Sequence, residues 1–136
     1  MAGPRVFTIE EAEQLLPDID AAFEEVDELR ETLRTAKLKL STLEMIWGPA
    51  LQNDDCPDHK EAAALFEQLR DTQEEVAGIV QRLSTMGVVV KDVASGLVDL
   101  YHVRDGRLVY LCWKRGEDNF IAWHHVDEGF ASRQAL

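Results

Sequence analysis

Three side chains in the last third of the sequence, an aspartate, a cysteine and a histidine, are of types that bind metal ions or take part in nucleophilic catalysis. They are Asp99, Cys112 and His124. Carboxylate, thiolate and imidazole are usual ligands of zinc-like ions, so the three predict a mononuclear metal site with Asp127 or Glu117 nearby. The alternative is structural: His124 donates a hydrogen bond to a carboxylate, and Cys112 packs as a small apolar residue. The sequence contains no Cys-x-x-Cys or His-Glu-x-x-His spacing that would favour the metal.

The same side chains also allow a nucleophilic interpretation, in which Cys112 attacks, His124 acts as its base and Asp99 orients the base. Cys112 falls in the middle of a predicted strand rather than at a helix N-terminus, where the pKa of a thiol is lowered, and this counts against the interpretation. Binding of a small molecule is a further possibility. The candidate ligand-binding residues are Asp99, Tyr110, Cys112, Glu117, His124, Asp127 and Arg133.

Arg133 lies near the end of the chain, in a segment with little regular pattern. Its guanidinium could clamp a carboxylate or a phosphate. It could instead pair with Asp127 or Glu117 and hold the C-terminal tail in place. We favour the second interpretation.

Residues 87–136 predict an antiparallel sheet that would bring the candidate residues together. Short β-branched and aromatic runs are separated by glycines nine or ten residues apart. Asp105-Gly106 predicts a two-residue hairpin turn, which sets Asp99 opposite Cys112. The last hairpin, across residues 115–119, pairs His124 with Tyr110 if its loop has five residues, whereas a one-residue slip puts Trp123 on that face.

This register predicts two different faces. The apolar face should pack on the helices, and His102 falls on it opposite Val109. The apolar face carries Val98, Leu100, Val109, Leu111 and Trp113, and the more polar face carries Asp99, Tyr101, Tyr110 and Cys112.

Residues 1–86 predict two long helices. Apolar residues step by three and four from 15 to 47 and again from 62 to 86. Residues 48–57 between them are rich in turn formers. Two seams of matching period joined by a short turn predict an antiparallel, coiled-coil-like helical hairpin. The fold class is therefore α+β, a long helical hairpin followed by a small antiparallel meander of three to four strands.

Local signals place the ends of these helices. Thr8 and Glu11 form a capping box, so the first helix begins near residue 9. Pro17 lies inside the pattern and predicts a kink or a short break just before it. Gly48-Pro49 ends the first long helix, and Gly87 ends the second.

Composition limits the possible classes of protein. A chain of 136 residues has room for one domain, with the hairpin in 1–86 and the meander and tail in 87–136. The 26 acidic and 14 basic residues give a net charge of −12, which argues against a nucleic-acid partner. No apolar run approaches the roughly 18–20 residues that span a bilayer. Two cysteines, Cys56 and Cys112, are too few for a disulfide framework, so we expect a reduced, cytoplasmic protein.

The lengths of the elements predict self-association. A helix over 15–47 is about 50 Å long, whereas a strand of six residues is about 20 Å, so the sheet cannot cover the outer half of the hairpin. The apolar residues left there are Leu40, Leu43, Met45, Ile46, Trp47 and Phe66. Because a patch of this size marks an interaction surface, we expect a homodimer in which two hairpins form a four-helix bundle.

The chain resembles, over nearly its whole length, a prokaryotic family known only as domain of unknown function 2203. The motifs that carry the resemblance are Phe7-Thr8-Ile9-Glu10-Glu11-Ala12 with Leu15-Leu16-Pro17, Val90-Lys91-Asp92, Gly96-Leu97-Val98-Asp99, Leu111-Cys112-Trp113-Lys114 with Gly116-Glu117, Trp123-His124 with Asp127, and Gly129-Phe130-Ala131 with Arg133-Gln134. Ser132 departs from the glycine usual at its position, and His102 and His125 lie outside the pattern. The resemblance implies no activity. It singles out as motif positions Asp99, Cys112, Trp113, Glu117, His124, Asp127 and Arg133.

Two functions follow as expectations. The first, which we favour because no catalytic signature is present, is a non-catalytic binding or interaction protein whose acidic hairpin or sheet face meets a partner. The second is a small-molecule or metal site, with or without catalysis, on the polar sheet face. Its residues would be Asp99, Cys112, His124, Asp127 and Arg133.

Overall fold

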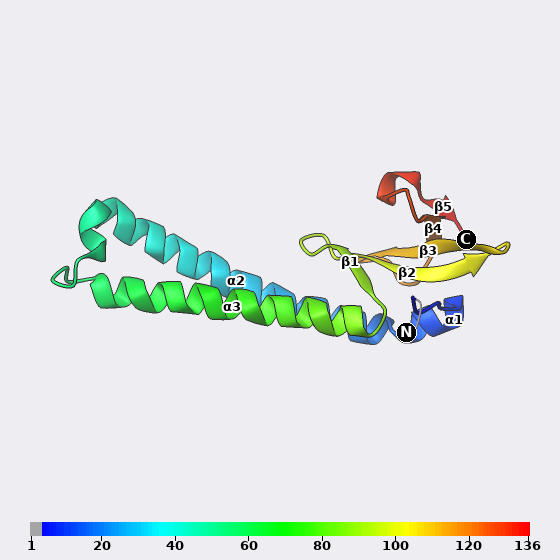
Figure 1. The fold of residues 1–136 in the computed structure, drawn as a ribbon, viewed down its shortest axis with the longest axis horizontal. Helices are drawn as coiled ribbons and strands as arrows, with labels where there is room; N and C mark the ends of the chain where they lie inside the picture. Colours follow the sequence, from blue (N-terminus) through cyan, green and yellow to red (C-terminus); the bar gives the residue numbers. More distant parts are fainter. Residues whose placement is uncertain (1–3) are drawn as a thin grey trace. The chain divides into compact units, whose positions relative to one another are not determined.

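The computed structural model describes residues 4–136 and has the expected α+β architecture. Three α-helices, α1 (Ile9–Gln14), α2 (Leu16–Trp47) and α3 (His59–Thr85), precede one antiparallel sheet (Figure 1). The chain divides into two compact units. The sheet unit consists of Met1–Glu24 and Val80–Leu136, and the hairpin unit consists of Glu25–Ile79.

The sheet has five strands in the order β1-β2-β3-β4-β5, so the prediction of three to four strands was too low. The strands are β1 (Val89–Asp92), β2 (Leu97–Arg104), β3 (Arg107–Lys114), β4 (Ala122–His125) and β5 (Gln134–Ala135). The additional strand is β5, two residues of the tail that pair with β4. A strand this short has too few residues to show the alternation by which strands are recognised in sequence.

The N-terminal helix begins and breaks for the expected local reasons. Thr8 Oγ1 accepts a hydrogen bond from the Glu11 amide, and the Glu11 carboxylate accepts one from the Thr8 amide. These hydrogen bonds to Thr8 lower the pKa of Glu11. The helix is interrupted at Leu15, and α2 starts at Leu16. Pro17 therefore lies in the first turn of a new helix, where its missing N–H is not needed, and it breaks the helix.

In the hairpin unit, the long helices end at a compact tip. Gly48, with φ of 57°, follows the last residue of α2 and starts a short 3₁₀ helix, η1 (Gly48–Gln52). The indole N–H of Trp47 donates to Asp58 at 2.8 Å, and His59 Nδ1 donates to the Leu51 carbonyl at 2.9 Å. These two hydrogen bonds connect the ends of both helices to the turn between them.

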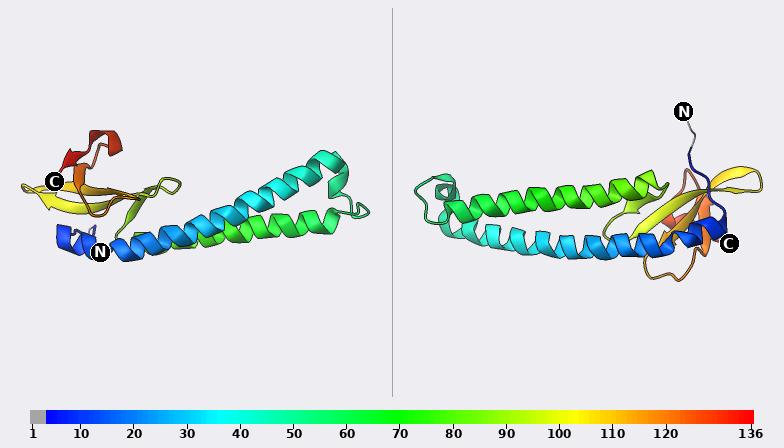
Figure 2. Two further views of the ribbon diagram at one scale, coloured as in Figure 1. Left: turned by 180° about the vertical axis from the view of Figure 1, so that it is seen from behind. Right: turned by 90° about the horizontal axis from the view of Figure 1, so that it is seen from below.

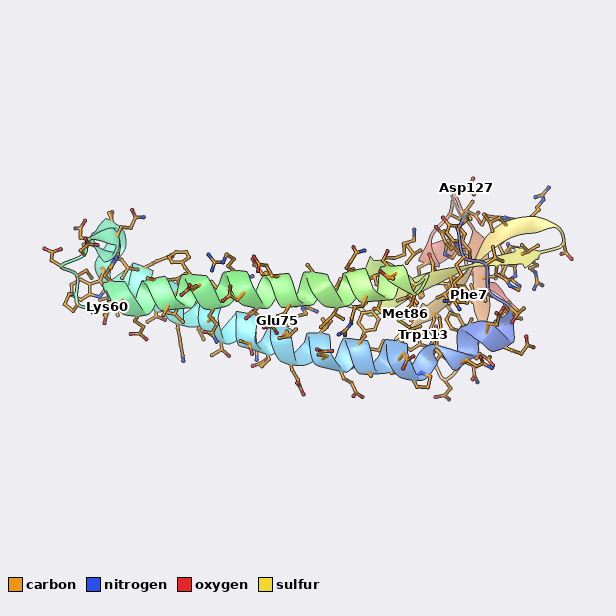
Figure 3. The ribbon with its side chains drawn as sticks, turned by 60° about the horizontal axis from the view of Figure 1, so that its bottom comes forward. Phe7, Lys60, Glu75, Met86, Trp113 and Asp127 are labelled. Atoms are coloured by element: carbon orange, nitrogen blue, oxygen red, sulfur yellow. The ribbon has the colours of Figure 1, made fainter. Side chains whose placement is uncertain are left out.

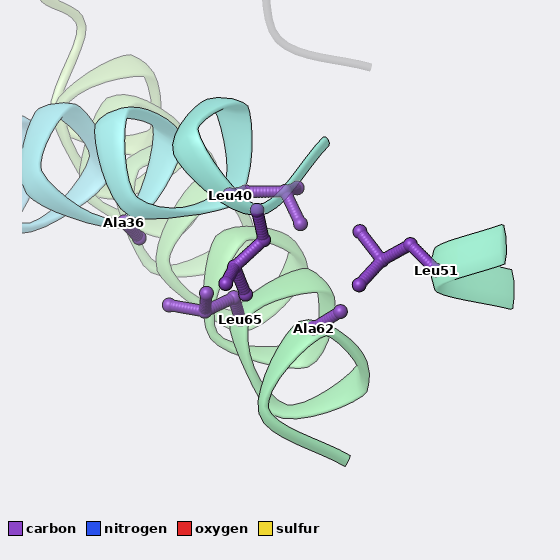
Figure 4. Close-up of a cluster of buried hydrophobic side chains, with 6 residues drawn as sticks. Ala36, Leu40, Leu51, Ala62 and Leu65 are labelled. Carbon is purple, nitrogen blue, oxygen red and sulfur yellow. The ribbon is translucent and has the colours of Figure 1, made fainter. Parts of the chain in front are cut away.

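A cluster of aliphatic side chains fills the tip (Figure 4). Its members are Ala36, Leu40, Leu43, Leu51, Ala62 and Leu65. Leu40 and Leu43 were expected to be uncovered, and this was wrong, because α3 and Leu51 of η1 bury them. Trp47 is also partly buried against the cluster. Met45, Ile46 and Phe66 are exposed, as expected.

The sheet unit has the predicted register. Asp105 and Gly106 both have positive φ, 51° and 75°, which is the conformation of a primed two-residue turn. Asp99 pairs with Cys112, as the turn predicts. The last hairpin also follows the predicted pairing, with His124 opposite Tyr110. The alternative, slipped register does not occur.

The middle of both faces of the sheet is buried, which the more polar character of one face did not predict, whereas Val103 and Leu108 near the turn are exposed. The apolar face is covered as predicted, and Trp113 on it is 1% exposed. On the other face Asp99, Cys112 and His124 are at most 2% exposed. In the sheet unit, α1 and the C-terminal segment containing η2 (Phe130–Ser132) lie on opposite sides of the sheet (Figures 1 and 2).

The N-terminal segment extends the sheet beside β2. Val6 forms a parallel bridge with Tyr101, and the Phe7 amide donates to the Tyr101 carbonyl at 2.8 Å. His102, on the apolar face, donates from Nδ1 to the Phe7 carbonyl at 2.7 Å. Figure 3 labels Phe7, Met86 and Trp113 in the sheet unit. Residues 5–7 are too few to show a strand pattern, so the bridge of Val6 to Tyr101 could not be predicted from the sequence.

Candidate functional site

Three adjacent strands bring together the three side chains from which a metal site was predicted. Asp99 comes from β2, Cys112 from β3 and His124 from β4. Because alternate residues of a strand point to the same face, the observed register places all three on one face. One ligand atom of each residue lies within 4.8 Å of the others, and all three residues are buried.

The imidazole of His124 is held at both ring nitrogens. Nδ1 lies 2.7 Å from the His125 carbonyl, and Nε2 lies 3.0 Å from Asp99 Oδ2. A carbonyl oxygen only accepts hydrogen bonds, so Nδ1 carries a hydrogen. Nε2 then faces a carboxylate oxygen that also has lone pairs. A proton or a metal ion must therefore lie between Nε2 and Oδ2 for this contact to be attractive.

The carboxylate of Asp99 is only half satisfied. Oδ2 contacts His124, whereas Oδ1 is buried and has no hydrogen-bond partner among residues 4–136. Burying a polar oxygen without a partner is costly. The orphaned oxygen is therefore a feature that needs an explanation.

The thiol of Cys112 is fully buried beside this carboxylate. Burial and the nearby negative charge of Asp99 raise the pKa of the thiol to about 12, while the positive charge of Arg133 acts in the opposite direction. In the absence of a metal, Cys112 is therefore a neutral thiol. This environment does not activate a nucleophile, since activation requires a lowered pKa.

Tyr110 lines the same face next to His124. Its ring centroid lies 5.5 Å from that of His124 and 4.6 Å from that of Tyr101. The ammonium of Lys91 lies 4.8 Å from the Tyr110 ring centroid, in cation–π geometry. Burial raises the pKa of the Tyr110 phenol, so its hydroxyl stays protonated.

Arg133 and Glu117 form an ion pair that holds the tail. Arg133 Nη2 donates to Glu117 Oε2 at 2.7 Å, and Glu117 Oε1 accepts from the Lys114 amide at 2.7 Å. The guanidinium also lies 4.6 Å from the Phe130 ring centroid. Of the two interpretations of Arg133, the structure has the pairing with Glu117. Both groups influence the pKa of Cys112, which places the pair near the thiol.

Asp127 lies outside the buried group. It is exposed, follows the last residue of β4 by two positions, and stands at the outer edge of the sheet unit in Figure 3. The structure thus brings together Asp99, Tyr110, Cys112 and His124. It places Glu117 and Arg133 beside them and separates Asp127 from them.

A second polar group on the opposite face was not proposed as a site from the sequence. Arg104, Arg107, Trp123 and His125 border a pocket of about 270 Å³ there. A sequence signal was available, since two arginines flank the Asp105-Gly106 turn and must pair with each other. The contribution of Trp123 depended on the register of the last hairpin.

A family model described as "Uncharacterized conserved protein (DUF2203)" matches residues 5–136. No curated protein and no solved structure matches the chain significantly. Among the helices formed by residues 4–136, none has the length and apolar character needed to cross a membrane.

Proposed function

We propose that this chain, which belongs to the DUF2203 family of uncharacterized conserved proteins, binds one zinc-like metal ion through Asp99, Cys112 and His124. One observation carries the proposal. Oxygen, sulfur and nitrogen ligand atoms from three strands converge within 4.8 Å at a buried point. This donor set suits zinc and similar first-row transition metals.

The hydrogen bonds of His124 support this assignment. Histidines that bind metals usually donate their other ring N–H to a carbonyl or carboxylate, which fixes the tautomer. Here the His125 carbonyl accepts from Nδ1 at 2.7 Å, so Nε2 can offer its lone pair to an ion. The ion would replace the proton between Nε2 and Asp99 Oδ2. Ligand atoms around zinc lie about 3–4 Å apart, so binding requires movements of about 1 Å or less.

The proposed site favours a structural role for the ion over catalysis. Three protein ligands leave the fourth position of a tetrahedral ion without a protein ligand, but all three are at most 2% exposed, so that position is not open to substrate. Binding must displace the proton of Cys112, because a coordinating thiol is deprotonated. Affinity should therefore rise with pH, and each bound ion should release protons.

Cobalt loading of the full chain tests the proposal. The chain is stripped with chelator, loaded with Co²⁺, and measured by elemental analysis and by the absorption band that a cobalt–thiolate bond produces. We expect one ion per chain in the unmodified protein. Cys112→Ser should abolish the band. The matched control is Cys56→Ser, which replaces the other cysteine, in the hairpin unit, and should leave the band intact.

Two results would overturn the metal site. One is a folded, chelator-stripped chain that takes up no stoichiometric Co²⁺ or Zn²⁺. The other is a thiolate band that survives Cys112→Ser and disappears with Cys56→Ser. Either would leave Asp99 and His124 as a structural carboxylate–imidazole pair.

We also propose that the chain forms a homodimer through the hairpin tip, as a non-catalytic interaction protein. The supporting observation is a group of large apolar side chains that are 55–88% exposed in the hairpin unit, Leu38, Met45, Ile46 and Phe66. Phe66 also borders an apolar pocket of about 410 Å³ at the tip. A second copy of the same tip would cover these side chains symmetrically.

Sedimentation at several concentrations tests the dimer. Met45→Asp combined with Phe66→Asp should shift the mass from dimer to monomer, because a charge cannot be buried unpaired in an apolar interface. The control is Ile121→Asp, which adds the same charge to an exposed apolar position in the sheet unit. A monomeric unmodified chain at every concentration would refute self-association.

A reducing, cytoplasmic location is part of the proposal. Cys56 and Cys112 are both free thiols, and free thiols are typical of reducing compartments. The net charge of −12 makes a nucleic-acid partner unfavourable. A fractionation experiment with the tagged full chain tests the location.

A further inference from the structure

We propose that the pocket at the turn end of the β2–β3 hairpin binds a small phosphate monoester. The pocket has a volume of about 270 Å³ and lies in the sheet unit. Its lining residues are Arg104, Asp105, Arg107, Val109, Trp123 and His125. It lies on the face opposite to the candidate metal site, because His125 and His124 are successive residues of β4 and point to opposite faces. The inference is therefore independent of the proposed metal.

The first observation is a cross-strand pair of like charges. Arg104 pairs directly with Arg107 across the turn, and like charges opposite each other destabilise a sheet. Neither arginine forms an ion pair with a carboxylate among residues 4–136. With one aspartate and a neutral histidine, the lining residues carry a formal charge of +1, in a chain of net charge −12. A bound anion would remove the repulsion.

The second observation is an unused buried donor. Trp123 Nε1 is buried and has no hydrogen-bond partner among residues 4–136. Buried polar groups nearly always have a partner, and an indole N–H can only donate. Trp123 borders the pocket, so a small shift of its ring on binding would bring this N–H within reach of an acceptor on the ligand.

The aromatic contacts hold these donors at the pocket. The guanidinium carbon of Arg104 lies 4.9 Å from the Trp123 ring centroid, in cation–π geometry. The His125 ring lies edge-on to Trp123 at 5.1 Å. Arg104 and Trp123 thereby hold each other in position before any ligand binds. This lowers the entropic cost of ordering their side chains on binding.

The number of donors favours phosphate over carboxylate. Two guanidinium groups and one imidazole border the pocket beside the Trp123 indole, and together they offer more N–H donors than the two oxygens of one carboxylate can use. The three terminal oxygens of a phosphate monoester can use them, and guanidinium groups bind phosphate with two parallel hydrogen bonds. Val109 and the Trp123 ring offer apolar surface to the esterified group. The volume limits this group to a small one, since pockets for drug-sized ligands span about 300–1,000 Å³.

Titration of the ¹⁵N-labelled full chain with phenyl phosphate tests the inference at constant ionic strength. The readout is the indole N–H signal of Trp123, identified by its absence in Trp123→Phe. We expect a saturable shift with phenyl phosphate. Arg104→Gln and Arg107→Gln should each weaken binding about tenfold, the effect of losing a hydrogen bond to a charged group. Arg70→Gln, at an exposed position on α3, is the matched control and should bind as the unmodified chain does.

Three outcomes would overturn the inference. They are a shift that does not saturate, benzoate binding as tightly as phenyl phosphate, and unchanged affinity in Arg107→Gln. Thermal unfolding of each variant shows whether it is folded. Arg107→Gln removes only the repulsion and should not lower the melting temperature, whereas Arg104→Gln also removes the cation–π contact with Trp123. Cys112→Ser should leave phenyl phosphate binding intact, so failure of the metal proposal would be seen separately.

Discussion

The two units of the molecule bury very different side chains. The hairpin tip buries a cluster of six aliphatic residues. The sheet unit buries Asp99 and His124, which form an ion pair or a shared-proton pair, together with the thiol of Cys112. Apolar burial stabilises a fold roughly in proportion to its area, whereas a buried ion pair contributes little net stability, because desolvation offsets the attraction.

Packing explains the buried side chains of one unit and not those of the other. The hairpin cluster is accounted for by packing. The sheet unit keeps a carboxylate with one unsatisfied oxygen where hydrocarbon would pack at no cost. A bound ion at this point would explain the residues that packing leaves unexplained.

The largest effect is expected from Asp99→Ala. Removing the carboxylate leaves His124 buried without its partner, which should lower the free energy of unfolding by about 3–5 kcal/mol. Urea unfolding of the metal-free chain, followed by circular dichroism, measures this change. Asp127→Ala is the control, because Asp127 is exposed in the same unit and its replacement should change stability by less than about 0.5 kcal/mol. A loss below 1 kcal/mol for Asp99→Ala would show that His124 can stay buried without its carboxylate partner at little cost.

A smaller loss is expected from the aliphatic cluster. Leu65→Ala removes a buried side chain of the tip and should cost about 2–3 kcal/mol, the lower part of the range for such changes. Leu65 is 7% exposed, so its side chain is not completely enclosed and the loss should be smaller than for a fully enclosed leucine. Gln68→Ala, at an exposed position on the same helix, serves as the control. If Leu65→Ala costs more than Asp99→Ala in the same unfolding assay, the ranking of the two cores is wrong.

Two glycines should respond to alanine with opposite signs. Gly87, in the sheet unit, has φ of 94°, and an added Cβ would lie 2.9 Å from the Phe7 ring. Gly87→Ala should therefore destabilise the chain by about 1–2 kcal/mol. Gly78 lies inside α3 with nothing within 4 Å of an added Cβ, so Gly78→Ala should stabilise by up to about 1 kcal/mol. Melting temperatures of the two variants measure the contrast, and equal signs would contradict it.

The smallest structural effect concerns the two thiols. At pH 8 the metal-free folded chain should react with a disulfide reagent at Cys56, which is partly exposed, and not at Cys112, which is buried. Mass spectrometry of the peptides locates the label. Rapid labelling of Cys112 in the folded chain would contradict the closed site.

The thiol of Cys112 should also make the stability of the metal-free chain depend on pH. Its pKa is raised in the folded state, from 9.0 to about 12, so the folded chain retains a proton that the unfolded chain loses. This contribution to stability is complete below pH 9 and is lost as the pH rises toward 12. Cys112→Ser should reduce this alkaline loss, as measured by urea unfolding between pH 8 and 11.

Much of the site could be predicted because its register depends on a local turn. The Asp105-Gly106 turn has two residues with positive φ and admits one pairing of β2 with β3, so the positions of Asp99 and Cys112 followed from it. The break before Pro17 also followed from a local rule. Contacts between distant segments were harder to predict. The bridge of Val6 to Tyr101 and the two-residue strand β5 rest on pairings too short to leave a periodic pattern.

Local sequence patterns are enough to predict the helical seams, the turn and therefore which side chains share a face of the sheet. These follow from the period of apolar residues and from backbone angles at single positions, which nearby residues control. Tertiary structure alone decided that the face with Asp99, Cys112 and His124 is buried. Burial depends on which distant segments cover a surface, and here the chain before α1 and the tail after β4 both return to the sheet. Because these segments exclude water, each buried polar side chain needs a hydrogen-bond partner or a counter-charge to offset the free-energy cost of its burial.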